Sequence, residues 1–242
     1  MRRAAHRARL CADPHFRQKW RVVWRQLAQL PRRGLRLLDA GCGDGRWSIE
    51  IALRRPEWIV VGLDRDRAHL DRAAALRRSL AIPNADFIAG DFLAFRAASP
   101  FDVVLAVCST HYGRTDEESE RLFARIREWL RPGGCVVLLQ PRCRTETPFA
   151  SRLGAPAWHD QFSAAALRRL CDRSDLQIDR LNSCIGRMGV VAKQLDWHRG
   201  RLAEPVKSAV RLVALGLAAV DARLPEPRRR SLMWLLVGHR PA

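Results

Sequence analysis

One stretch of the chain combines residues that suit ligand binding. The segment DAGCGDG, residues 39–45, starts with an aspartate and carries glycine at three alternate positions, Gly41, Gly43 and Gly45. Glycine lets the chain turn sharply and lets a ligand lie directly against the backbone. Two more aspartates, Asp64 and Asp91, end the next two apolar runs. These residues predict a binding site made of bare backbone and carboxylates.

The spacing between the glycines and the next aspartate narrows the class of ligand. Asp64 follows Gly45 by 19 residues, and an acidic side chain at the end of a second strand can accept hydrogen bonds from two ribose hydroxyls. Dinucleotide-binding proteins share this arrangement, but their glycines follow the pattern G-x-G-x-x-G, in which the last glycine lets the helix approach a pyrophosphate. Arg46 stands at that position here. We therefore expect a ligand without a pyrophosphate.

Apolar periodicity predicts strands that alternate with helices, which is typical of an α/β fold with a mostly parallel sheet. Strands are expected at residues 35–40, 58–64, 85–91, 101–108, 134–141, 176–184 and 231–238. Helices are expected at residues 16–30, 46–56, 66–80, 117–130, 163–174 and within 205–225. The carboxyl ends of the first strands would then bring the glycines and aspartates together.

Five segments, in this order, resemble those of class I S-adenosylmethionine-dependent methyltransferases. They are LLDAGCGDG, VVGLDRD, IAGDF, FDVVLAVCSTHY and WLRPGGCVVLLQP, within residues 35–141. The resemblance implies a Rossmann-like, doubly wound sheet of seven strands, mostly parallel with the last strand antiparallel. Separately, the stretch of about 45 residues between the last two strands is far longer than an ordinary connection and predicts a helical insertion there.

The resemblance implies S-adenosylmethionine as the cofactor and assigns residues to it. The glycine-rich segment would wrap its methionine and ribose part, and Asp64 would bind the ribose hydroxyls. Asp91 would accept a hydrogen bond from the adenine amino group, with Phe92 beside the base. The end of the fourth strand would border the amino acid moiety. The full expected set is Asp39, Gly41, Cys42, Gly43, Gly45, Asp64, Arg65, Asp91, Phe92, Cys108 and Ser109.

His111 and Tyr112 are the candidate catalytic residues, because they follow the fourth strand at the edge where open α/β sheets bind ligands. An imidazole titrates near neutrality, so His111 could take a proton from an acceptor hydroxyl. Tyr112 could orient the acceptor or simply pack. Methyl transfer from a sulfonium needs mainly an in-line approach in a desolvated pocket, so positioning alone could supply most of the rate.

The net charge of +18 raises the question of an anionic partner. A positive field favours nucleic acid, anionic lipid or phosphorylated substrates, but the arginines are spread along the whole chain. The Pro-Cys-Ser and Asn/Asp-Pro-Pro-aromatic motifs of base-directed methyltransferases are absent; Val107 precedes Cys108. A small-molecule acceptor is therefore favoured. An RNA methyltransferase and a catalytically silent binding protein stay as alternatives.

We expect a single domain over residues 1–242, with four parts. They are a helical lead-in (1–34), a cofactor-binding core (35–184), a helical insertion (185–230) and the last strand (231–242). The insertion contains a largely apolar helical stripe, which would suit a lid over the site, a dimer element or, through residues 201–230, a membrane-surface contact. A lid of this kind would favour a hydrophobic or lipid-linked acceptor.

The cysteines and histidines indicate the cellular compartment of the protein and whether it binds a metal. Seven cysteines without a C-x-x-C pair argue against a closed disulfide framework. The histidines form no zinc-type spacing with them, so we expect no metal. These features favour a cytoplasmic location, with peripheral contact at the inner membrane surface as a variant.

Overall fold

The computed structural model describes residues 2–110, 115–141, 162–185, 205–221 and 233–242. Its strands are β1 (Arg36–Ala40), β2 (Ile59–Asp64), β3 (Ala85–Ala89), β4 (Phe101–Val107), β5 (Leu130–Pro141), β6 (Gln177–Cys184) and β7 (Met233–His239). Its helices are α1 (Arg2–Cys11), α2 (Pro14–Leu27), α3 (Arg46–Arg54), α4 (Arg67–Ser79), α5 (Asp116–Trp129), α7 (Ala164–Arg173) and α9 (Val206–Asp221).

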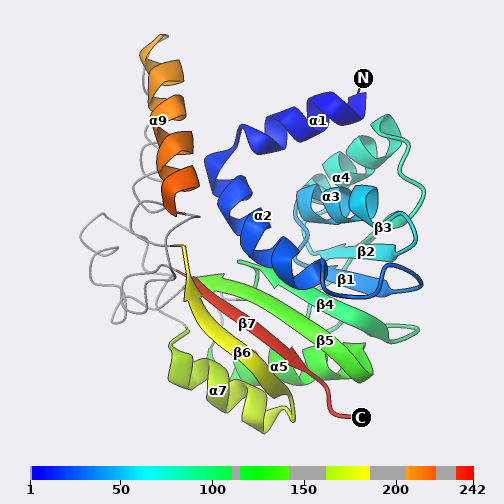
Figure 1. Cartoon of the computed structure of the whole chain (residues 1–242). Helices are drawn as coiled ribbons and strands as arrows, with labels where there is room; N and C mark the ends of the chain where they lie inside the picture. The colour runs from blue at the N-terminus through cyan, green and yellow to red at the C-terminus, as the bar shows by residue number, and fades with distance from the viewer. Residues whose placement is uncertain (1, 111–114, 142–161, 186–204, 222–232) are drawn as a thin grey trace.

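All seven strands belong to one sheet, in the order β3-β2-β1-β4-β5-β7-β6 (Figure 1). The pairings from β3 through β5 are parallel, and β7 runs antiparallel to both of its neighbours, β5 and β6. The central strands are largely apolar and buried because helices cover both of their faces. This topology confirms the fold class expected from the sequence.

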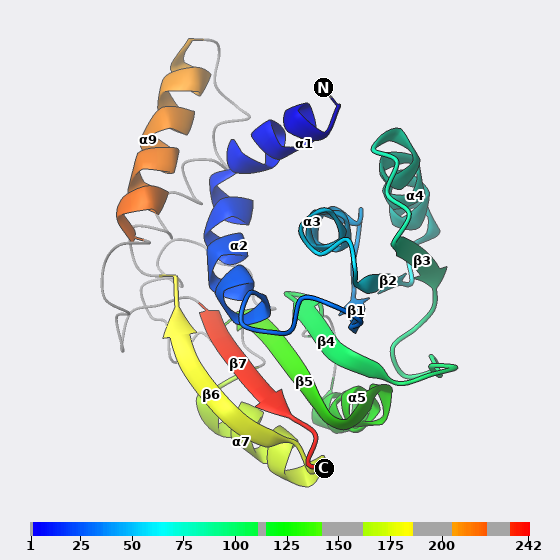
Figure 2. The same ribbon diagram turned by 45° about the vertical axis from the view of Figure 1, so that its right-hand side comes forward.

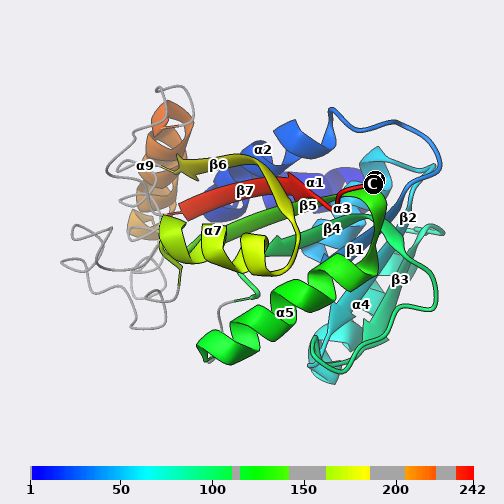
Figure 3. The same cartoon turned by 90° about the horizontal axis from the view of Figure 1, so that it is seen from below.

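Helices pack on the sheet in two layers. In Figure 1, α1 to α4 lie above the sheet, and Figure 2 shows α3 between α2 and α4. Figure 3 shows α5 and α7 across the opposite face. Helix α2, which the sequence predicts at residues 16–30, is buried against the upper face through Phe16, Trp20, Val23 and Leu27. Each layer therefore fixes one face of the strands that carry the site.

Two differences from the expected elements have a physical cause. Helix α1 has too few apolar residues to be predicted, and it is held by tertiary contacts: Leu10 is buried, and the Arg3 guanidinium donates to the carbonyl oxygens of Leu80 and Ala81. Strand β5 begins at Leu130, four residues before the expected start. Its glycine turn is paired with the chain end, since Gly133 N donates to the Arg240 carbonyl oxygen.

The helix expected within residues 205–225 is present as α9, and it stands beside α2 (Figure 1). Ala214 is buried, and the Arg211 guanidinium donates to the Ala12 carbonyl oxygen at 2.8 and 3.0 Å. Leu212 and Val213 are exposed. The division of the chain into four parts, and the role of the insertion, stay predictions.

Candidate active site

A cavity of about 370 Å³ opens at the edge of the sheet where the parallel strands end. Its lining comes from the segments that follow β1, β2, β3 and β4. The lining residues are Gly41, Gly43, Asp64, Arg65, Asp66, His69, Gly90, Asp91, Phe92, Cys108 and Ser109. Eight of these eleven were expected from the sequence; the other three are Asp66, His69 and Gly90.

The glycine-rich loop needs glycine for two different reasons. Gly41, Gly43 and Gly45 all have positive φ, at 79°, 53° and 74°, which side chains other than glycine adopt only with strain. A Cβ on Gly41 would lie 2.2 Å from the Cβ of Ser109. A Cβ on Gly43 would meet nothing within 4 Å. The loop is thus packed against protein at Gly41 and bare toward open space at Gly43.

Asp64 lies at the end of β2 and supports the loop. Its Oδ2 accepts a hydrogen bond from Gly43 N at 2.8 Å, and its Oδ1 accepts one from Asp66 N at 3.0 Å. Each carboxylate oxygen can accept more than one hydrogen bond. The half-buried carboxylate can therefore hold the loop and still accept hydroxyl donors from a ligand in the cavity.

Asp91 and Phe92 form the wall beyond β3. Asp91 is exposed, and its Oδ1 accepts a hydrogen bond from Leu93 N at 2.8 Å. Phe92 is 7% exposed and packs edge-on against Trp129, with ring centroids 6.3 Å apart. This wall offers a fixed acceptor beside an apolar ring, which suits an aromatic base that carries an amino group.

Three expected site residues lie behind the lining. Asp39 is 1% exposed and accepts a hydrogen bond from Ser48 Oγ at 2.6 Å. Burial raises its pKa to about 7. Cys42 is buried, and burial raises the pKa of its thiol. A Cβ on Gly45 would lie 2.7 Å from the Cβ of Ala73, so this glycine lets α3 begin close to α4.

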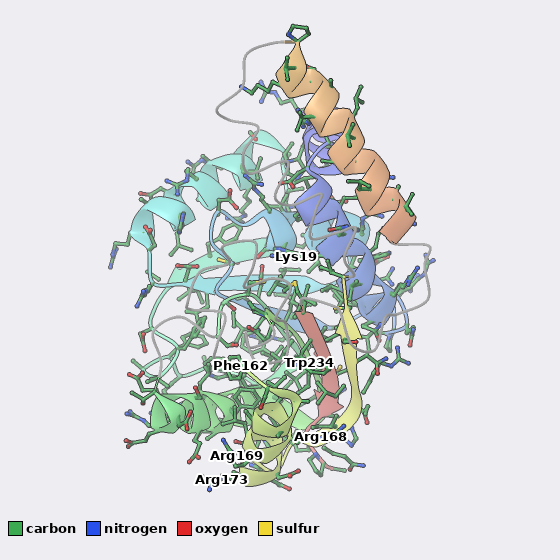
Figure 4. The ribbon with its side chains drawn as sticks, turned by 90° about the vertical axis from the view of Figure 1, so that its left-hand side faces the viewer. Lys19, Phe162, Arg168, Arg169, Arg173 and Trp234 are labelled. Atoms are coloured by element: carbon green, nitrogen blue, oxygen red, sulfur yellow. The ribbon has the colours of Figure 1, made fainter. Side chains whose placement is uncertain are left out.

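The residues at the end of β4 are uncharged, and the ammonium of a lysine on another element, α2, lies against them. Ser109 Oγ donates to the Ala40 carbonyl oxygen at 2.6 Å. Cys108 adopts a positive φ of 55°, and its Sγ lies 3.1 Å from Lys19 Nζ on α2. Figure 4 looks onto this edge of the sheet and shows Lys19 between α2 and the strand ends. We did not expect Lys19 from the sequence.

Sequence signals for the unexpected residues differ in kind. Asp66 caps α4, because its side chain accepts from the backbone N–H groups of Ala68 and His69; an aspartate before a helical run is a usual signal for this. For Lys19 the only sequence signal is that lysine is rare among the basic residues of this chain. The chain has 43 lysines and arginines together, and only positions 19, 193 and 207 are lysine.

His111 and Tyr112 lie outside the described residues, so their catalytic roles stay predictions. None of the described residues of α9 lines the cavity. Among the residues that the structure describes, no three potential metal ligands come close enough to hold an ion.

Comparison with known proteins identifies the family to which the central segment of the chain is similar. Residues 37–134 match the family model described as "Methyltransferase domain". This segment belongs to that family. The match covers β1 to the start of β5 and therefore includes every described lining residue of the cavity. The resemblance to class I methyltransferases that the sequence predicted is confirmed.

Named relatives share the methyltransferase domain over part of their length. Ribosomal RNA large subunit methyltransferase G of Streptomyces avermitilis is 35% identical over 112 residues, which are 45% of this chain and 30% of the relative. Trans-aconitate 2-methyltransferase of Deinococcus radiodurans is 32% identical over 115 residues, 47% of this chain and 41% of the relative. The chain thus spans less than half the length of these curated relatives.

A solved structure extends the likeness in fold to most of the chain. Geranyl diphosphate C-methyltransferase from Streptomyces coelicolor A3(2), in complex with Mg²⁺, geranyl diphosphate and S-adenosyl-L-homocysteine, has a TM-score of 0.62 and 16% identity. The superposition covers 92% of this chain and 78% of that one. The methyltransferase domain here therefore shares its fold with that enzyme.

Proposed function

We propose that the protein transfers a methyl group from S-adenosylmethionine to a small-molecule acceptor. The observation that carries the proposal is the cavity, in which bare backbone at Gly43 and two carboxylates, Asp64 and Asp91, line one space. All of these groups lie in the segment that matches the methyltransferase family.

The lining groups fit the chemical parts of this cofactor. Asp64 has acceptor capacity for the two ribose hydroxyls, and Asp91 can accept from the adenine amino group beside Phe92. Gly43 leaves room for close approach to the backbone. When bound, S-adenosylmethionine supplies a methyl group on a positively charged sulfur. The chain's own part is to bind, orient and exclude water.

The proposed acceptor is a small molecule, and the relatives support this class. Trans-aconitate methyltransferases recur among them. The hydrophobic acceptor expected from a lid stays a prediction, because no described residue of α9 lines the cavity. His111 as a proton acceptor and Tyr112 as an orienting residue also stay predictions.

RNA is the second candidate acceptor, because one relative is a ribosomal RNA methyltransferase and the net charge is +18. Among the described residues, no helix is long and apolar enough to cross a membrane. We propose a cytoplasmic location. Peripheral contact through residues 201–230 and the oligomeric state have no support beyond the sequence.

Transfer of a labelled methyl group tests the proposal. The protein is incubated with S-adenosylmethionine labelled on the methyl group and with separate pools of small acids, lipids and RNA. We expect label in the small-acid pool, and less label with the Asp64→Ala variant when the cofactor is not saturating. Label in the RNA pool alone would favour the second candidate. Absence of label from every pool, and of any S-adenosylhomocysteine product, would contradict the proposal.

A further inference from the structure

Lys19 is a cation beside the cavity: its ammonium contacts the lining residue Cys108, and its contacts leave most of its hydrogen-bonding capacity unused. Its ammonium carries three N–H donors, and the hydrogen bond resolved for it goes to the thiol of Cys108, 3.1 Å away. A thiol is a weak acceptor. Among the described residues, no carboxylate lies within 4.0 Å of Lys19 Nζ.

The position of Lys19 is fixed by the packing of α2. Its neighbours Trp20 and Val23 are buried in the core of the upper layer. The start of α2 is tied to the start of α3, because Arg46 Nη1 lies 3.4 Å from Asp13 Oδ2. Lys19 is itself half-buried. The backbone of Lys19 is therefore fixed by the packing of α2, which brings its half-buried side chain to the end of β4.

Charge divides the cavity into two ends. The acidic lining residues Asp64, Asp66 and Asp91 lie at or after the ends of β2 and β3. The basic lining residues at that end have acidic neighbours, since His69 Nδ1 lies 3.3 Å from Asp66 Oδ2 and Arg65 stands between Asp64 and Asp66 in the chain. The lining residues after β4, Cys108 and Ser109, are uncharged. A ligand anion is repelled at the acidic end and attracted at the end where Lys19 lies.

We propose that Lys19 binds a carboxylate that enters the cavity at the end of β4. The inference rests on the proposed function, which brings two sources of such a group to this end. One is the amino acid carboxylate of S-adenosylmethionine, and the other is a carboxylate of the acceptor. In both cases the ammonium donates a charge-assisted hydrogen bond, which is among the stronger polar contacts in proteins.

The test compares four proteins by calorimetric titration. They are the wild type, Lys19→Met, Lys19→Arg and the control Lys207→Met, which removes the same charge from α9. Methionine keeps an unbranched apolar side chain on the helix, so all variants should fold; thermal unfolding checks this. The first arm uses S-adenosylhomocysteine and 5′-methylthioadenosine, which share the adenosine and sulfur but differ in the amino acid part. The second arm adds trans-aconitate to protein saturated with S-adenosylhomocysteine.

If Lys19 binds the carboxylate of the cofactor, Lys19→Met should raise the Kd for S-adenosylhomocysteine about 10- to 100-fold. The Kd for 5′-methylthioadenosine should be unchanged. If Lys19 instead binds a carboxylate of the acceptor, Lys19→Met should keep its affinity for the cofactor and lose the binding of trans-aconitate. In both cases Lys19→Arg should retain most of the affinity, and Lys207→Met should match the wild type.

Equal behaviour of the wild type and Lys19→Met in both arms, including no binding of trans-aconitate by either, would overturn the inference. A wild-type protein that does not bind S-adenosylhomocysteine at all would instead overturn the proposed function. The two failures are therefore distinguishable.

Discussion

The two sides of the glycine-rich loop have different surroundings. The inner side faces protein: Asp39 is buried against Ser48, and a Cβ on Gly41 or Gly45 would overlap a neighbouring side chain, although the backbone of Gly41 also lines the cavity. The outer side, defined by Gly43 and Asp64, faces the cavity. One sequence motif therefore does two jobs. We expect changes on the inner side to alter stability and changes on the outer side to alter ligand affinity.

Gly41→Val should give the largest effect. The new Cβ would lie 2.2 Å from Ser109 Cβ, and the backbone has a φ of 79°. Left-handed strain and overpacking together should lower the free energy of unfolding by about 2–5 kcal/mol. Urea denaturation measures this. Stability equal to that of the wild type would show that the inner side is not tightly packed.

Asp39→Asn should change how stability depends on pH. Burial raises the pKa of Asp39 from 3.8 to about 7, so the folded state holds this proton more tightly than the unfolded state does. The stability contributed by the protonated group is full below pH 4 and is lost as the pH rises toward and through 7. Asparagine can still accept from Ser48 Oγ and does not titrate.

Relative to the wild type, Asp39→Asn should therefore gain about 2–4 kcal/mol of unfolding free energy between pH 4 and pH 8. Denaturant unfolding at several pH values measures the difference. Asp86→Asn, at an exposed aspartate on β3, is the control and should show no comparable gain. If the difference in unfolding free energy between Asp39→Asn and the wild type does not change with pH, the carboxyl beneath the loop is not buried and protonated.

Asp64→Ala should weaken ligand binding more than it weakens folding. It removes the carboxylate expected to bind the ribose hydroxyls, at a cost of about 1–3 kcal/mol in binding. Calorimetry with S-adenosylhomocysteine measures the loss, and Asp86→Ala provides the control on a neighbouring strand. An unchanged Kd would remove Asp64 from the site.

Gly43→Ala should give the smallest change in stability. Nothing lies within 4 Å of the new Cβ, so only the strain of a φ of 53° remains, about 1 kcal/mol. Gly34→Ala is the matched control, because Gly34 also has a positive φ and an open Cβ position but does not line the cavity. Both variants should lose similar stability, and only Gly43→Ala should lose affinity for S-adenosylhomocysteine. Equal affinities would mean that no ligand approaches Gly43.

The sequence predicted the sheet well because its information is local. Central strands such as β2 and β4 are short apolar runs, and a helix such as α5 buries one clear apolar stripe. Helix α1 was missed because it depends on contacts with Leu80 and Ala81, far away in the sequence. The predicted start of β5 is four residues too late because the glycines at its start pair with a distant segment.

The candidate site was predictable only in part, for the same reason. The motif identified the loop and the aspartates, but it could not separate Asp39, which is buried, from Asp64, which lines the cavity. That distinction depends on packing against Ser48 and α3. The contact of Lys19 with Cys108 joins residues 89 positions apart. Hydrophobic periodicity describes α2 only as a packing element and gives no sign of this contact.

A calorimetric titration of the wild-type protein with S-adenosylhomocysteine tests the central claim most directly. The account predicts saturable binding of one molecule per chain, with a Kd below the high micromolar range, and competition by S-adenosylmethionine. No saturable binding at high micromolar ligand would contradict the assignment of the cavity as a cofactor site.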